Sequence, residues 1–232
     1  MFSKVFLAMT SREMESTLPN RIAYMACHFS PYSAGLSNAP RQLPENSLLL
    51  VDDSMPVHGH DPKLVADQLK ELAERFSVSA VLLDFQREQS DPATEMVSAI
   101  LQVLPCPVAV TESYAKELDC PVFLSPPPIN KALQDYLAEW LTQGVYLEVA
   151  PEMRKLTVTE SGCEDAALPM NTDSALPLTD KRLHCHYGIE VFPDRAVFTL
   201  QRTKEDLAAL AEEAYTLGVQ GAVGLYQELS RL

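Results

Sequence analysis

The sequence is poor in basic residues. Lys and Arg number 18 against 32 Asp and Glu, and the formal net charge of the 232 residues is −14. A phosphate backbone or an anionic bilayer repels such a surface, so we expect neither a nucleic-acid nor a membrane partner. No window approaches the roughly 18 apolar residues of a membrane helix. The apolar run within residues 1–10 is also too short for a signal-peptide core. These absences predict a cytoplasmic protein.

Several chemical motifs are missing as well. The five cysteines are an odd number, lie far apart and include no C-x-x-C pair, which is typical of reduced, buried thiols. No G-x-S-x-G motif is present, which argues against a hydrolase with a nucleophile elbow. No glycine-rich phosphate loop follows an early apolar run, which argues against a dinucleotide-binding fold. We therefore expect no cofactor.

Short apolar runs alternate with amphipathic helical patterns along most of the chain. Asp61-Pro62 and Asp91-Pro92 each combine a capping residue with a proline at the first helical position. The periodicity predicts four helices, over residues 62–76, 91–104, 131–143 and 203–217. The apolar runs predict eight strands, at residues 5–8, 22–26, 47–51, 80–83, 108–110, 122–124, 145–149 and 222–225.

This alternation is typical of a parallel sheet with helical crossovers. Eight strands are the number that closes a (β/α)8 TIM barrel, so we predict an α/β barrel that forms one domain over residues 1–232. An open doubly wound sheet is the alternative. Residues 152–200 interrupt the alternation, and the runs at 185–192 and 196–200 flank a Pro-Asp-Arg turn. This segment predicts a β-rich insertion containing a hairpin, and it leaves a lean barrel.

Polar residues follow almost every predicted strand. In a TIM barrel these positions gather at one end, where active sites lie. One interpretation is that the strand ends simply reach solvent. The other is a cleft lined by carboxylates, suited to acid–base chemistry on a sugar. The residues concerned are Asp52, Asp53, Asp84, Gln86, Glu112, Glu148, Tyr226, Gln227 and Glu228.

Residues 67–86 favour the second interpretation. There an amphipathic helix runs directly into a strand that ends Leu-Asp-Phe-Gln. This passage resembles the D-x-x-D-x-D-x-E strand of the chitinase-type (family 18) glycoside hydrolases. In that family the final Glu protonates the glycosidic oxygen, and the preceding Asp orients the substrate's N-acetyl group, which acts as the nucleophile. The resemblance places Asp84 at the last Asp and Gln86 at the acid, with Ser79 and Leu82 at the earlier Asp positions.

The departure at Gln86 bears on catalysis, because an amide cannot donate a proton as a carboxylic acid does. Glu88 and Glu112 are the nearby acids that could replace it, so the candidate catalytic residues are Asp84, Glu88 and Glu112. The candidate substrate-binding residues are Asp53, Gln86, Glu148, Tyr226, Gln227 and Glu228. The resemblance implies a glycoside-hydrolase-like barrel that binds a carbohydrate-like small molecule and whose catalysis is absent or rebuilt.

Two other functions stay open at this point. His184, His186 and Glu190 share one face if they lie on a strand, and two imidazoles and a carboxylate could bind Zn²⁺ or Fe²⁺ in a metal-dependent hydrolase. His58-Gly59-His60 is a second histidine pair near a strand end. The other alternative is a non-enzymatic structural or interaction protein, in which Asp84 only caps neighbouring backbone N–H groups.

Overall fold

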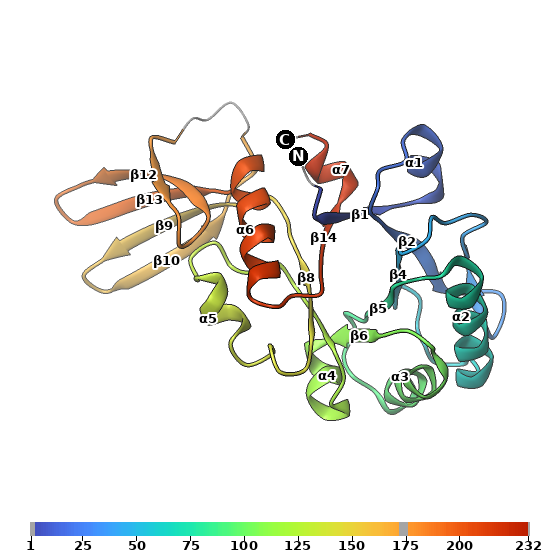
Figure 1. Ribbon diagram of the computed structural model, residues 1–232. Coiled ribbons are helices and arrows are strands. Elements are labelled where there is room, and N and C mark those ends of the chain that lie inside the picture. The colour runs from blue at the N-terminus through green and yellow to red at the C-terminus, as the bar shows by residue number, and fades with distance from the viewer. Residues whose placement is uncertain (1–2, 172–175, 232) are drawn as a thin grey trace.

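The computed structural model describes residues 3–171 and 176–231, and its core is a closed parallel barrel (Figure 1). The strands follow the order β1-β14-β8-β7-β6-β5-β4-β2, and pairing of β1 with β2 closes the ring. This confirms the predicted barrel and excludes the open sheet. The strands are β1 (Val5–Met9), β2 (Ile22–Phe29), β4 (Leu48–Asp52), β5 (Ala80–Asp84), β6 (Val108–Thr111), β7 (Val122–Leu124), β8 (Val145–Glu148) and β14 (Gly221–Leu225).

The helices outside the barrel form an incomplete ring. Longer helices follow β4 and β5 and precede β14, whereas residues 30–47 hold the two-residue strand β3 (Leu36–Ser37) and no helix. None of the helices in residues 3–171 and 176–231 is long and apolar enough to cross a membrane. The helices are α1 (Ser11–Ser16), α2 (Pro62–Phe76), α3 (Asp91–Val103), α4 (Glu112–Leu118), α5 (Leu133–Leu137), α6 (Lys204–Thr216) and α7 (Tyr226–Leu229).

Local chemistry explains where the helices begin and end. The Asp61 carboxylate accepts hydrogen bonds from the backbone N–H groups of Lys63 and Leu64, which starts α2 as predicted. The helix predicted over residues 131–143 is shorter, because tight turns replace it after Leu137. In these turns the N–H of Trp140 bonds to the carbonyl of Leu137, and the N–H of Gln143 bonds to that of Trp140.

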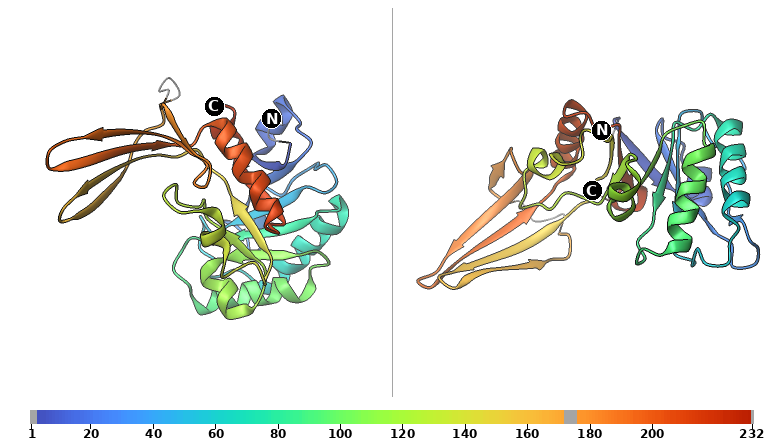
Figure 2. Two further views of the ribbon diagram at one scale, coloured as in Figure 1. Left: turned by 60° about the vertical axis from the view of Figure 1, so that its left-hand side comes forward. Right: turned by 90° about the horizontal axis from the view of Figure 1, so that it is seen from below.

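The chain between β8 and α6 forms a second sheet, which projects away from the barrel (Figures 1 and 2). It is antiparallel, with the order β10-β9-β13-β12-β11, and β12 with β13 forms the predicted hairpin. The β9–β10 hairpin has no counterpart among the predicted elements, because every residue of β10 is exposed and the strand lacks an apolar face. The strands are β9 (Met153–Thr159), β10 (Gly162–Ala167), β11 (Leu178–Asp180), β12 (Cys185–Val191) and β13 (Arg195–Gln201).

Arg202 joins this sheet to the barrel. Its side chain is only 1% exposed, and its guanidinium donates to the carbonyl oxygens of Pro127 and Leu183. One guanidinium nitrogen lies 3.6 Å from a carboxylate oxygen of Glu152. Since Pro127 follows β7 and Glu152 follows β8, this one cation ties the root of the second sheet to the barrel's rim.

Candidate functional site at the barrel mouth

Alternating strand residues fill the barrel interior and define which side chains reach its open end. Leu50, Leu82, Ala109 and Tyr146 belong to one buried cluster contributed by the inward faces of the strands. Side chains alternate along a strand, so the residues two positions further on also face inward. These residues are Asp52, Asp84, Thr111 and Glu148, each the last residue of its strand. We call the ring of these carboxyl-terminal strand ends the mouth.

Three carboxylates at the mouth influence one another. Asp52 and Asp84 are paired across β4 and β5. Burial raises the pKa of Asp84; the hydrogen bond from Gln86 lowers it, and the charges of Asp52 and Asp53 raise it further. Burial, together with the charges of Asp84 and Glu228, raises the pKa of Glu148 to about 7. A carboxyl group with such a pKa can exchange a proton near neutral pH.

Gln86 lies where the resemblance places an acid, and it contacts the neighbouring carboxylate. Its side-chain amide donates a hydrogen bond to the Asp84 carboxylate, and Gln86 is an exposed residue. This pairing occupies one acceptor of Asp84 and leaves the other carboxylate oxygen with lone pairs for a ligand. Glu88, two residues further along, is exposed in the same loop.

Asp53 holds that loop in place. Its side chain is buried and accepts hydrogen bonds from the backbone N–H groups of Gln86, at 2.9 Å, and Arg87, at 3.0 Å. The Arg87 side chain donates to the carbonyl oxygens of Asp53 and Ser54, both at 2.7 Å. Asp53 was expected to bind substrate; in the structure its carboxylate positions the chain that carries Gln86.

Tyr136 joins the site from α5. Its hydroxyl donates to the carbonyl oxygen of Ser125 at 3.0 Å, directly after β7. Burial, with the charges of Glu112 and Glu148, raises the pKa of Tyr136 to about 12. Glu112 itself is the exposed first residue of α4. Tyr136 was not among the predicted residues, because the sequence pattern there indicates only a helix face.

The three candidates after β14 separate in the structure. Leu225 packs against the interior cluster, so the next residue, Tyr226, turns outward and packs in the layer between strands and helices. Tyr226 also lines a cavity of about 420 Å³ beside Leu7 and Arg21. Glu228 lies close enough to Glu148 to raise its pKa, and the Gln227 side chain bonds to Glu13.

The expected metal triad does not form. His184 contacts Glu213, and the Nδ1 atom of His186 lies 2.8 Å from Asp206; both partners belong to α6. Glu190 is exposed near the far end of β12. Residues 3–171 and 176–231 contain no group of three His, Cys, Asp or Glu side chains able to hold a metal ion. Each histidine is therefore paired with a carboxylate of α6 instead of converging with the other and with Glu190.

In the second histidine pair, His58 and His60, the ring of His60 contacts backbone carbonyl oxygens. Both ring nitrogens of His60 face carbonyl oxygens: Nε2 lies 2.9 Å from that of Ser30, and Nδ1 lies 3.1 Å from that of Val57. His58 is exposed.

No family model and no curated protein sequence matches this chain. Solved structures do match. A class V chitinase from Nicotiana tobaccum aligns with a TM-score of 0.56 and 11% identity, over 97% of this chain and 94% of that one. A mutant class V chitinase from Cycas revoluta, crystallised with (GlcNAc)3, aligns with a TM-score of 0.56 and 12% identity, over 98% and 96%.

The barrel resembles those of the chitinase-type glycoside hydrolases. The spore cortex-lytic enzyme SleL of Bacillus cereus also aligns, with a TM-score of 0.50 and 8% identity over 89% of this chain, and the chain spans 63% of that enzyme's length. At these identities the likeness establishes a glycoside-hydrolase-like fold. Activity and ligand have to be argued from this chain's own residues.

Proposed function

We propose that the barrel mouth binds a carbohydrate, and that Asp84 is the residue on which binding depends. The observation that supports this most strongly is the convergence of Asp52, Asp84 and Glu148, whose strands all end facing the same interior. Carboxylates accept hydrogen bonds from vicinal hydroxyls, and the Gln86 amide both donates and accepts. The (GlcNAc)3 complex of the Cycas revoluta neighbour favours a sugar as the ligand.

We further propose that the acid-dependent hydrolysis of the chitinase-type family is lost at this site. Gln86 stands at the position of the proton donor, and its amide is bonded to Asp84. Of the two substitute acids predicted from the sequence, Glu88 points from an exposed loop and Glu112 from the exposed start of α4. Glu148 is the mouth carboxyl whose pKa, about 7, suits proton transfer, so any residual acid catalysis would depend on it.

The test is a thermal-shift assay of the wild-type chain against chito-oligosaccharides and peptidoglycan fragments. A ligand present at 100 times its dissociation constant adds about 2.7 kcal/mol of stability, which is a readily visible shift. We expect a shift for the wild type and none for Asp84→Ala. Glu71→Ala, which removes an exposed acid from the helix α2 outside the barrel, serves as the matched control and keeps the shift.

Hydrolysis is measured in parallel on chromogenic chito-oligosaccharides. We expect none above background for the wild type and weak turnover for Gln86→Glu, which restores a carboxylic acid beside Asp84. If no sugar in the panel shifts the melting temperature of the wild type, the binding proposal fails. The alternative of a non-enzymatic structural or interaction protein, in which Asp84 has a structural role, is then favoured.

A further inference from the structure

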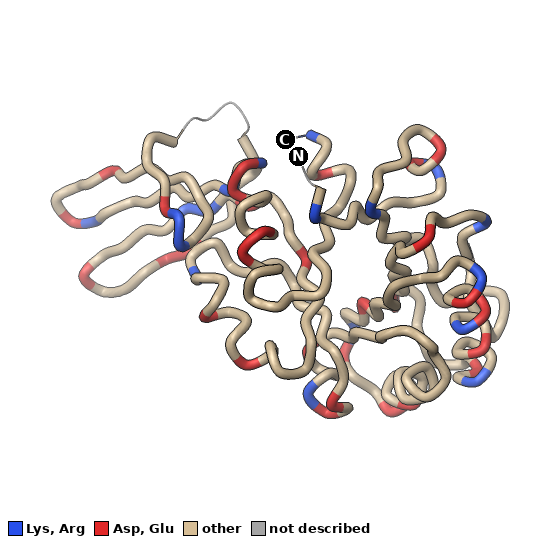
Figure 3. The backbone as a smooth tube through the Cα atoms, viewed as in Figure 1, with Lys and Arg blue, Asp and Glu red and all other residues tan. Residues whose placement is uncertain are grey.

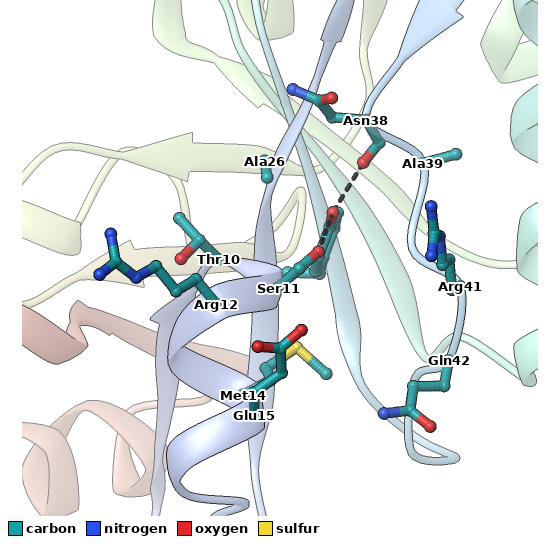
Figure 4. A pocket seen from close by; sticks show the side chains of 11 residues that line it. Thr10, Ser11, Arg12, Met14, Glu15, Ala26, Asn38, Ala39, Arg41 and Gln42 are labelled. Atoms are coloured by element: carbon teal, nitrogen blue, oxygen red, sulfur yellow. Dashed lines mark hydrogen bonds between the residues drawn. The ribbon is translucent and has the colours of Figure 1, made fainter.

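A cavity of about 990 Å³ lies against the barrel between α1 and residues 38–42 (Figure 4). It occupies the gap in the helical ring, because the described chain has no helix between β2 and β4. Tyr24 lies between the two sides. Its hydroxyl is 2.9 Å from Oγ of Ser11 on α1 and donates to the carbonyl oxygen of Asn38 at 2.7 Å. These bonds fix the two sides relative to each other, so the cavity is formed before any ligand binds.

The barrel strand β2 separates this cavity from the mouth carboxylates. Ala23 belongs to the interior cluster, whereas the next residue, Tyr24, packs in the outer layer and lines the cavity. Asp52 and Asp84 face the interior, on the other side of that strand. A ligand in the cavity therefore meets different side chains from a ligand at the mouth.

The charge of the lining is opposite to that of the chain. Arg12 and Arg41 both line the cavity, and Glu15 is the one acid among the described lining residues. Within residues 3–171 and 176–231, neither arginine forms a hydrogen bond or ion pair through its side chain. By contrast, Arg154, Arg182 and Arg202 pair with carboxylates. Figure 4 shows the Arg12 side chain extending away from residues 38–42, so the group that favours an anionic ligand is the unpaired guanidinium of Arg41, in a chain of net charge −14.

The neutral part of the lining indicates what else the ligand carries. The side-chain amides of Asn38 and Gln42 have no hydrogen-bond partner in the described chain, and each both donates and accepts. Figure 4 shows Gln42 and Arg41 on the segment that faces α1, with Glu15 on the helix. Amides, a guanidinium and a carboxylate on facing sides suit a molecule with several hydroxyl groups, and the volume is at the upper end for small-molecule sites.

We infer that this cavity is a second ligand site that binds a hydroxyl-bearing anion of sugar size, the class that includes sugar acids and sugar phosphates. Arg41 binds the anionic group, and Asn38 and Gln42 bind the hydroxyls. The site is independent of the carbohydrate site proposed at the mouth.

Calorimetric titration of the full chain at low ionic strength tests this inference, with glucuronate, glucose 6-phosphate, glucose and inorganic phosphate as probes. We expect at least one of the two sugar anions to bind and glucose not to bind. Binding of glucuronate alone identifies a carboxylate ligand, and binding of glucose 6-phosphate alone identifies a phosphate ligand. Arg41→Gln should weaken binding at least tenfold. Arg75→Gln, an exposed arginine of α2 that lies over the Phe76 ring, should leave it unchanged.

Three results would each overturn the inference: no binding of either sugar anion, equal binding of glucose, or equal loss in Arg41→Gln and Arg75→Gln. Inorganic phosphate binding as tightly as glucose 6-phosphate would also contradict it, because the hydroxyls would then contribute nothing. Asp84→Ala should bind the anions as the wild type does, which separates this site from the mouth. Melting temperatures of the two arginine variants serve as the folding control. We expect both to match the wild type, because the Arg41 and Arg75 side chains are exposed.

Discussion

Glu148 is the side chain whose ionisation should dominate the pH dependence of stability. Burial chiefly raises its pKa from the ordinary 4.5 to about 7 in the folded protein. Between these two pH values the folded protein holds a proton that the unfolded chain releases. Stability therefore falls as the pH rises through this window, and the whole penalty is present above pH 7.

Glu148→Gln removes that penalty, because an amide stays neutral at every pH. We expect the variant to exceed the wild type by about 1–2 kcal/mol at pH 8, a figure reduced for the partial exposure of the side chain. Near pH 4.5 the two proteins should be about equally stable. Urea denaturation at both pH values provides the measurement. A difference of the same size at pH 4.5 and pH 8 would contradict the burial argument.

Asp53 is expected to act on structure rather than on ligand. Asp53→Ala leaves the N–H groups of Gln86 and Arg87 without their acceptor and should cost about 2 kcal/mol, since hydrogen bonds to a charged group contribute 1.5–3 kcal/mol. Hydrogen exchange at these two amides should accelerate. Glu88→Ala, in the same exposed loop, is the control and should change neither quantity. Unaltered exchange in Asp53→Ala would show that the loop is held by other contacts.

Single residues also show which features of the site the sequence could predict and which it could not. Asp84 and Gln86 could be placed at the site because they follow a buried strand. The sequence could not show that Tyr226 lies outside the mouth, because the face of a residue after a strand depends on the strand's register. In the structure Leu225 faces in and Tyr226 faces out. His184 and His186 find their carboxylate partners on α6, twenty or more residues further along the chain, and no local pattern indicates that pairing.

At the scale of the elements, capping separates two helices that look alike in sequence. Both begin with an acidic residue and a proline, but Asp61 caps α2 with its side chain, whereas Asp91 is the first residue inside α3 and Ser90 makes no capping bond. Asp61→Ala should therefore cost about 1 kcal/mol in the free energy of unfolding. Ser90→Ala should cost nothing measurable. Equal losses in chemical denaturation of the two variants would refute this assignment.

Strand positions could be predicted more fully than helix lengths. A barrel strand such as β5 is buried on both faces, so its sequence is a continuous apolar run whose limits are visible. The helix α4 has only seven residues and two buried side chains, Tyr114 and Ala115, which is too short for a periodic pattern. The β9–β10 hairpin is mostly exposed and has no pattern to detect.

At the scale of the whole molecule, a closed barrel brings together residues that lie far apart in sequence. Asp52 and Glu148 are separated in the chain by three barrel strands, β5, β6 and β7, and closure of the ring orients both toward one interior. Acidic residues are spread over the barrel and the second sheet rather than gathered on one element (Figure 3). The negative charge of the chain as a whole therefore does not mark the site; the inward direction of particular carboxylates does.

We propose that the mouth around Asp84 recognises a carbohydrate. The most direct test of this proposal is a calorimetric titration of the wild type, Asp84→Ala and Glu71→Ala with the GlcNAc tetramer at pH 6. We expect saturable binding by the wild type and by Glu71→Ala, and at least a hundredfold weaker binding by Asp84→Ala. Binding of equal strength by all three proteins, or by none of them, would contradict it.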